Sequence, residues 1–418
     1  MSLHEKIQET TYTAEMLRKV MSTPLHVGAP NFGDMARFTE RVAAIYDNRW
    51  LTNDGPFVRE FEERIATIAG VKHCVAMCNA TVALEILIRA AGIAGEVIVP
   101  AYTFVATAHA LQWQQITPVF CDIEPDNHTI NPSEIERLIT PRTTAIIGVH
   151  IWGKSCNVAA LKAIADRRNL LLMFDAAHAF GCSHGGRPIG GNGLAEVFSF
   201  HATKFLNAAE GGAVVTNDDE LASKMRLMRN FGFSGYDNVI YIGTNGKMNE
   251  LSAAMGLTSL ESMERFLAVN KRNYEAYQTA LTGLPGISLI DYDNSEQQNY
   301  QYVVLDVSPS CPLSRDQLVQ VLHGENVLAR RYFFPGVHKM EPYRSFYPNA
   351  GLLLPVTERV VEQVLVLPTG TTVSEEDISR IGQILGWAVS NSDRLCQELP
   401  KTIPPGCSMQ LKEHAVDA

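Results

Sequence analysis

The stretch from residue 199 to residue 218 reads SFHATKFLNAAEGGAVVTND. It starts at the end of a short apolar run, contains a lone lysine, Lys204, and passes through Gly211 and Gly212 into a second apolar run. A lysine in a cleft at a strand end can lose its proton when desolvated, and it then acts as a nucleophile toward carbonyl groups. A solvated surface lysine, paired for example with Glu210, is the simpler alternative, so the surrounding sequence has to decide between the two.

Apolar runs of strand length alternate with helical patterns on both sides of this stretch. The runs occupy residues 72–78, 96–101, 117–123, 144–150, 170–177, 196–200 and 212–217. Helical patterns lie between them, for example at residues 81–92 and 157–169. Continuously apolar strands that alternate with helices predict an α/β fold with a mostly parallel seven-stranded sheet covered on both faces. Ligands of such sheets bind beyond the carboxyl ends of the strands, so the polar residues after each run are the candidates for function.

Breaks in the pattern divide the chain. Residues 1–24 are polar and predict a partly helical lead-in, and residues 25–283 form the expected large domain, which ends in a long helical region near 248–283. The sequence Leu-Pro-Gly at 284–286 breaks that region, and residues 284–392 carry the strand and helix signals of a smaller α+β domain. Residues 393–418 contain few apolar residues and predict a flexible tail.

Composition excludes several classes of function. The formal net charge is -10, which argues against general binding to nucleic acids or to a membrane surface. No apolar stretch approaches the roughly 20 residues that span a bilayer, and the N-terminus has no apolar signal region. Eight cysteines are scattered without a CxxC pair, so we expect reduced core residues, no metal site and a cytoplasmic protein.

Two strand ends carry residues that suit a phosphorylated, flat ligand. Ala80 and Thr81 open a helix after the first run, and small residues at a helix start leave N–H groups free for an anion, although an ordinary N-cap is the commoner explanation of such a motif taken alone. Phe104 follows the second run and can cover a flat ring, although core packing is the commoner role of an aromatic residue.

An acid and two further polar residues follow later runs. Asp175 ends the fifth run, and aspartate is almost never fully buried without a partner, which favours a functional role. His178 can orient a ligand or be a satisfied core histidine. Ser199 ends the sixth run, five residues before Lys204.

Together these residues form the set that pyridoxal 5'-phosphate requires. Its aldehyde forms a Schiff base with a lysine, and its ring nitrogen needs a carboxylate to stay protonated while the ring accepts electrons. Its phosphate needs N–H and hydroxyl donors. Asp175 precedes Lys204 by 29 residues, a step of the size of one βαβ unit, so adjacent strands can bring both to one ligand.

The combination of motifs resembles the DegT/DnrJ/EryC1/StrS family of nucleotide-sugar aminotransferases, over residues 24–390. The stretches that carry the resemblance are WLTNDGPFVREFEERIA (50–66), IVPAYTFVATAHAL (98–111), FDAAHAFGC (174–182), SFHATKFLNAAEGGAVVTND (199–218) and TNGKMNELSAAMGL (244–257). The resemblance implies the fold-type-I aminotransferase architecture, with a three-layer large domain. It implies that Lys204 forms the Schiff base and moves the proton, and that Asp175 pairs with the ring nitrogen.

The same resemblance assigns the remaining cofactor contacts. Ala80, Thr81 and Ser199 would hold the phosphate, Phe104 would stack on the ring, and His178 would contact the cofactor hydroxyl. Asn245 stands where the family sends an asparagine from the partner subunit to the phosphate, so a homodimer with shared active sites is implied. Substrate contacts are expected from loops 24–33 and 50–57, and from Tyr332, Pro335, His338 and Lys339.

The resemblance also implies the reaction. L-glutamate gives the amino group and becomes 2-oxoglutarate, and a nucleotide-linked keto-sugar receives the group. The SFHATK…EGG form is similar to enzymes that aminate C4 of a dTDP- or UDP-linked 4-keto-6-deoxyhexose in amino sugar biosynthesis. A C3 keto-sugar or keto-inositol aminotransferase is the nearest alternative, and a non-catalytic regulatory relative is the alternative of another class. The intact Lys204 argues against dehydrating relatives, which carry histidine there.

Overall fold

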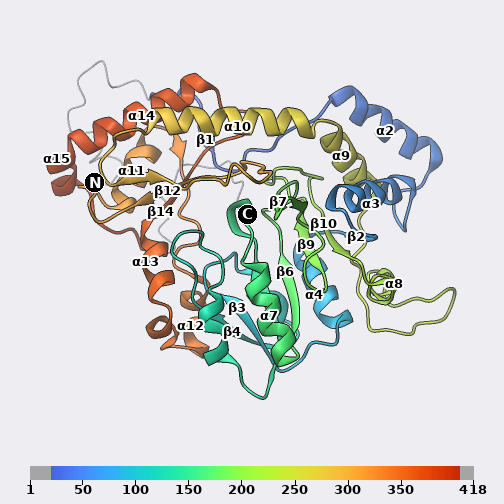
Figure 1. The fold of residues 1–418 in the computed structure, drawn as a ribbon. Coiled ribbons are helices and arrows are strands. Elements are labelled where there is room, and N and C mark those ends of the chain that lie inside the picture. Colours follow the sequence, from blue (N-terminus) through green and yellow to red (C-terminus); the bar gives the residue numbers. More distant parts are fainter. Residues whose placement is uncertain (1–19, 405–418) are drawn as a thin grey trace.

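The computed structural model describes residues 20–404 (Figure 1). Most of the predicted lead-in, residues 1–19, and the end of the predicted tail, residues 405–418, lie outside the described residues. A mostly parallel seven-stranded sheet forms the centre of the fold. Its strands are β2 (His73–Met77), β3 (Glu96–Pro100), β4 (Thr117–Cys121), β5 (Thr143–Val149), β6 (Leu171–Asp175), β9 (Glu196–Ser199) and β10 (Gly212–Thr216).

The strand order across the sheet is β2-β10-β9-β6-β5-β3-β4. Only β10 runs antiparallel to its neighbours, β2 and β9, and the other strands of the sheet are parallel to one another. Each of the seven predicted runs contains most or all of one strand of this sheet, so the predicted fold class is confirmed. The runs read as continuously apolar because both faces of the sheet are covered.

Residues that alternate along a strand contribute to different cores on the two faces. In β2, Val75 and Met77 pack into a core with helices α4, α5 and α8, whereas Cys74 and Ala76 face α3 and α9. Ile146 of β5 faces α7. The sheet is therefore the middle layer of three. These helices span α3 (Pro56–Ala69), α4 (Ala80–Ala90), α5 (Ala106–Gln112), α7 (Val158–Arg168), α8 (Asp219–Met228) and α9 (Glu250–Glu261).

Local sequence explains where the helices near the sheet edge begin. Asn79 caps α4, because its side-chain oxygen accepts a hydrogen bond from the N–H of Val82 at 2.9 Å. Pro56 occupies the first turn of α3, where its missing N–H costs nothing, and Gly70 ends that helix at a φ of 66°. The predicted helical region near 248–283 is divided at Ser262 into α9 and α10 (Met263–Ala280).

The C-terminal part of the chain builds a second sheet with its own core. Strands β11 (Ile287–Leu289), β12 (Val303–Val307) and β14 (Val364–Leu367) are antiparallel, and helix α10 runs along the edge of the molecule from α9 to α14 (Figure 1). The core of this part also takes Tyr277 and Leu281 from the end of the α10 region. The end of α10 therefore packs on the C-terminal part, and we propose the boundary between the two domains at residues 283 and 284, in the turn that leads from α10 into β11. Its helices are α11 (Arg315–Gly324), α12 (Tyr343–Phe346), α13 (Pro355–Gln363), α14 (Glu375–Ser390) and α15 (Ser392–Glu398).

Short elements complete the described fold. They are β1 (Leu25–His26), which pairs with β13 (Val327–Leu328), the hairpin of β7 (Ser183–His184) and β8 (Arg187–Pro188), helices α2 (Met35–Asn48) and α6 (Pro132–Ile135), and the 3-10 turns η1 (Glu136–Leu138), η2 (Ile151–Gly153), η3 (Val337–Lys339) and η4 (Ala350–Leu353).

The expectation of a flexible tail from residue 393 is wrong for residues 393–404. Helix α15 includes residue 393, and Leu395 and Leu399 are buried against the C-terminal core. The composition of this segment is misleading because these two leucines are spaced one helical turn apart among polar residues. Two apolar side chains suffice here because the surface that they cover is already built by α11 and α14.

Within residues 20–404, no helix is both long and apolar enough to cross a bilayer. The same range contains no group of three or more His, Cys, Asp or Glu side chains placed to hold a metal ion. The seven cysteines in this range are all free thiols.

Candidate active site

Parallel strands of the central sheet end at one edge, and the predicted site residues gather there. Strand β6 ends at Asp175 and β9 ends at Ser199, while β2 and β3 end just before the helices α4 and α5. Carboxyl ends of parallel strands are where α/β folds place their ligands.

Asp175 is held as a buried carboxylate by two donors. Its side chain lies in the interior, the hydroxyl of Thr107 on α5 donates to Oδ2 at 2.8 Å, and the N–H of Ala177 donates to Oδ1 at 3.1 Å. Burial raises the pKa of Asp175, and the two hydrogen bonds and the positive charge of Lys204 oppose that rise. A cationic group that bonded to this carboxyl group would stabilise its charged form against the cost of burial.

Lys204 lies in a turn just after β9, closed by a hydrogen bond from its own N–H to the carbonyl of His201 at 2.9 Å. Its Nζ donates to the hydroxyl of Tyr302 at 3.3 Å. Burial lowers the pKa of Lys204 to about 8, and the negative charge of Asp175 acts in the opposite direction. Each of the two groups therefore affects the pKa of the other, as expected if they share one site.

A cavity opens beside Lys204. Residues from the N-terminal loop, from the lysine turn and from the C-terminal part line it, namely Val27, Gly28, Ala29, Asn31, Thr203, Lys204, Phe205, Asn270, Gln301, Tyr302, Tyr332, Leu367, Thr369 and Gly370. Gly28 has a φ of +79°, and a Cβ there would stand 2.9 Å from Cβ of Thr203, so the N-terminal loop can approach the lysine turn only with glycine at this position. Asp175 does not line this cavity, and neither does His178, whose ring lies 4.4 Å from that of the cavity residue Tyr302.

His178 is a neutral member of an aromatic wall. Its ring stacks on Trp152 at 5.8 Å, and its Nδ1 accepts a hydrogen bond from the N–H of Trp152 at 3.3 Å. Burial and the charge of Lys204 lower the pKa of His178 well below its ordinary value. Because Nδ1 accepts, the proton of the neutral ring is on Nε2, which leaves that nitrogen as a donor.

The predicted phosphate cradle is assembled around Gly212. The Cα of Gly212 pairs with Ser199 across β10 and β9, and a Cβ on Gly212 would stand 2.4 Å from the backbone nitrogen of Ala80. Ser199 therefore lies close to the first turn of α4, which begins with Ala80 and Thr81. First-turn N–H groups have no partner inside their helix, and together with a hydroxyl they suit a phosphate.

Several predicted residues lie away from Lys204, Asp175 and Gly212 in the single chain. Phe104 is 51% exposed, and its ring lies 6.3 Å from Phe333. Asn245 is exposed, and the carbonyl of its neighbour Gly246 accepts a hydrogen bond from Cys78 at the end of β2. The expectation that His338 and Lys339 contact substrate does not fit the cavity of Lys204, since both pair with Glu358 in a separate hollow.

Other residues of the site were not predicted. Thr107 stands in the quoted stretch at 98–111, and its place in the first turn of a helix after a strand is a signal that could have been used. Tyr302 and Gln301 come from a segment about 100 residues away from Lys204, and nothing in their local sequence marks them.

Comparison with known proteins identifies the family. The model of the DegT/DnrJ/EryC1/StrS aminotransferase family matches residues 34–386. The chain belongs to this family.

Relatives of this aminotransferase are similar over most of their length. A dTDP-4-amino-4,6-dideoxy-D-glucose transaminase of Escherichia coli is 36% identical over 86% of this chain and 97% of its own. The crystal structure of DesI in the presence of its TDP-sugar product is 48% identical, with a TM-score of 0.87 over 91% of this chain and 96% of its own. The Helicobacter pylori aminotransferase PseC is 27% identical, with a TM-score of 0.82 over 88% of this chain and 100% of its own.

Like its family, this aminotransferase depends on pyridoxal phosphate, and its residues fit that cofactor. The amine of Lys204, whose pKa is lowered, lines a cavity, and the buried carboxylate of Asp175 lies within its electrostatic reach. Gly212 lets β10 approach the start of α4 closely, which brings Ser199 near the first-turn N–H groups of that helix.

Proposed function

We propose that this aminotransferase converts a dTDP-linked 4-keto-6-deoxyhexose to the 4-amino sugar, with L-glutamate as amino donor and 2-oxoglutarate as the other product. The observation that carries the proposal is the placement of Lys204, whose amine lines a cavity, has a pKa of about 8 and lies within electrostatic reach of the buried carboxylate of Asp175. The choice of C4 and of the nucleotide is supported by the transaminase of Escherichia coli and by DesI, whose names give a 4-amino sugar and a TDP-sugar.

When bound, pyridoxal phosphate supplies an aldehyde that takes up amino groups and a ring that accepts electrons from the substrate carbon. Asp175 would hold a proton on the ring nitrogen, because its carboxylate is fixed by Thr107 and Ala177 and otherwise lacks a cationic hydrogen-bond partner in the described chain. Ser199 and the first turn of α4 would bind the phosphate.

Lys204 would be the base that moves a proton between the substrate carbon and the cofactor. An amine with a pKa of about 8 is neutral in roughly a quarter of the molecules at pH 7.5, against about 0.1% for an ordinary lysine. The hydroxyl of Tyr302 accepts a hydrogen bond from Nζ and so orients the amine in the cavity. His178 would donate a hydrogen bond from Nε2 to a cofactor oxygen, and Phe104 would cover the ring, as the family resemblance implies.

We further propose a homodimer in which Asn245 reaches the phosphate of the partner's site. The segment between α8 and α9 extends away from the rest of the fold (Figure 1) and exposes Phe231, Phe233, Tyr236, Val239, Ile240, Tyr241 and Ile242. Exposed apolar patches of this kind mark interaction surfaces, and Asn245 follows directly at the base of the segment. We place the reaction in the cytoplasm, as the cysteine pattern of the sequence predicts.

The first test is spectroscopic and catalytic. Purified protein with pyridoxal phosphate should show an absorbance band at the visible edge and form 2-oxoglutarate from L-glutamate and the dTDP-linked 4-keto sugar. Lys204→Ala should lose both, whereas Lys162→Ala, which removes a surface lysine paired with Asp166, should lose neither. A colourless protein, or turnover confined to 3-keto sugars or keto-inositols, would contradict the proposal.

Mixing two inactive variants tests the shared site. A mixed dimer of Lys204→Ala and Asn245→Ala chains has one site with both lesions and one with neither. Statistical mixing should therefore restore up to about a quarter of wild-type activity. No recovery in a mixture that exchanges subunits would show that Asn245 serves its own chain's site.

A further inference from the structure

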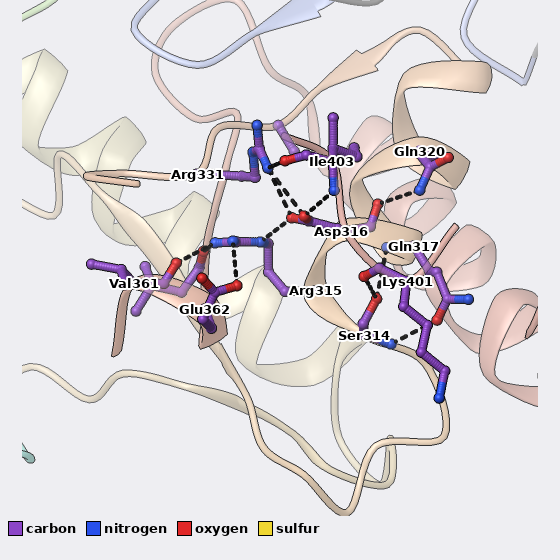
Figure 2. A network of polar contacts seen from close by, with 12 residues as sticks. Ser314, Arg315, Asp316, Gln317, Gln320, Arg331, Val361, Glu362, Lys401 and Ile403 are labelled. Atoms are coloured by element: carbon purple, nitrogen blue, oxygen red, sulfur yellow. Dashed lines mark hydrogen bonds and ion pairs between the residues drawn. The ribbon is translucent and has the colours of Figure 1, made fainter. Parts of the chain in front are cut away.

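A buried carboxylate at the start of α11, outside the site described above, ties three parts of the chain together (Figure 2). Asp316 is 2% exposed and accepts hydrogen bonds from Nε of Arg315 at 2.6 Å and from Nη1 of Arg331 at 3.1 and 3.2 Å. The backbone N–H of Ile403 donates to the same carboxylate at 2.6 Å. Bonds to a buried charge are strong, and the loss of one donor leaves the charge partly uncompensated.

Residues 399–403, which we name the C-terminal strap, are docked on α11 through their backbone. Ser314 donates to the carbonyl of Lys401 at 2.6 Å, and Arg331 donates to the carbonyl of Ile403 at 2.7 Å (Figure 2). The side-chain amides of Gln317 and Gln320 donate to the carbonyls of Leu399 and Pro400, each at 3.1 Å. The strap is thus held by side chains of Ser314, α11 and Arg331 that bond to its main chain, in addition to the burial of its own Leu399 and Ile403 against the C-terminal core.

Arg331 connects the strap to the segment that carries Tyr332, a residue of the Lys204 cavity. Its guanidinium lies 4.3 Å from the centre of the Phe334 ring, and the guanidinium of Arg315 lies 5.1 Å from the same ring. Arg331 and Phe334 belong to the segment 330–334, which also carries Tyr332, a residue that lines the cavity of Lys204. The strap and the cavity therefore contact neighbouring residues of one short segment.

An aromatic stack continues from that segment to His178. The rings of Tyr332 and Phe333 stack at 5.2 Å, those of Phe333 and Trp152 at 5.6 Å, and those of Trp152 and His178 at 5.8 Å. Tyr102 adds a hydrogen bond to the carbonyl of Tyr332. A shift of residues 330–334 would therefore move the wall that faces substrate.

We infer that the C-terminal strap, acting through Asp316 and Arg331, positions the 330–334 wall of the substrate cavity. Asp316 and Arg331 are positioning residues, since neither lines the cavity of Lys204. The part of the inference that concerns substrate rests on the proposed function. The family match ends at residue 386, so the strap lies outside the region that this chain shares with the family model.

Two matched pairs of full-length variants test the inference. Ile403→Pro removes the N–H that donates to Asp316, while Ile403→Val keeps it. Asp316→Asn removes the buried charge, while Asp377→Asn removes a half-buried carboxylate that caps α14 in the same part of the chain. The measurements are hydrogen exchange of a 330–336 peptide in the apoprotein, thermal unfolding, and KM and kcat for the dTDP-linked keto-sugar.

Ile403→Pro and Asp316→Asn should speed exchange in 330–336 about tenfold, the size expected for one charge-assisted bond. They should also raise KM for the sugar three- to tenfold, with kcat within about twofold and the cofactor absorbance retained. Ile403→Val and Asp377→Asn should lower thermal stability slightly, but should change neither the exchange rate in 330–336 nor KM for the sugar. The inference is wrong if Ile403→Pro and Asp316→Asn lower thermal stability while exchange in 330–336 stays as in the wild type. The exchange result does not depend on turnover, so it decides the inference even if the proposed substrate is wrong.

Discussion

Replacing Lys204 by methionine should stabilise the apoprotein at neutral pH. Folding lowers the pKa of this lysine from 10.5 to about 8, because the protonated amine loses water in the site. A pKa difference of one corresponds to ~1.36 kcal/mol, so holding the charged lysine costs the folded state about 3 kcal/mol. This figure is an upper bound, since the side chain lines a cavity and is only partly buried. Methionine has a similar length and carries no charge.

The stability difference between Lys204→Met and the wild type should depend on pH in one direction. Below pH 8 the lysine is protonated in both the folded and the unfolded state, and the full cost applies. Between pH 8 and about 10.5 the folded state loses its proton first, so the cost shrinks, and above that range it vanishes. The advantage of Lys204→Met should therefore be largest near pH 7 and fall as the pH rises toward 10.5.

Urea unfolding of cofactor-free protein from pH 6.5 to 10 measures this difference. Lys271→Met, at an exposed position of α10, is the control and should show no such trend. Extra apolar burial by methionine would add a constant that does not change with pH. A difference between wild type and Lys204→Met that stays flat over this range, or that grows with pH, would refute the reasoning.

Three further predictions concern the cradle, the acid and the exposed segment. Thr107→Val removes the hydroxyl that donates to Asp175, which leaves a buried oxygen unsatisfied, and should weaken pyridoxal phosphate binding about tenfold in an absorbance titration; unchanged affinity would contradict the role of Thr107. Gly212→Ala should cost roughly 1–3 kcal/mol in urea unfolding, because its Cβ would meet the backbone of α4, whereas Gly324→Ala, with open space around it, should not. Ile242→Asp should convert the proposed dimer to a monomer in light scattering, and a dimer that persists would place the interface elsewhere.

The sequence alone predicted the central sheet because its strands are buried on both faces. A strand of that kind must be apolar throughout, so runs such as 144–150 and 212–217 can be found without knowledge of their neighbours. Asp175 was recognisable for the same reason, since a carboxylate after a fully apolar strand needs a partner. The lone Lys204 gained its meaning from the family motif around it.

Only the tertiary structure decided which segments meet. The antiparallel placement of β10 between β2 and β9 sets Gly212 against α4, and no local pattern encodes that neighbour. Tyr302 and Tyr332 reach Lys204 from the C-terminal part of the chain. Residues 399–403 looked like a loose tail because, apart from the burial of Leu399 and Ile403, their docking uses main-chain groups, which every sequence has, and side chains of Ser314, α11 and Arg331. The hydrophobic pattern of a segment shows which of its faces is buried. Which other segment covers that face is decided only by long-range packing.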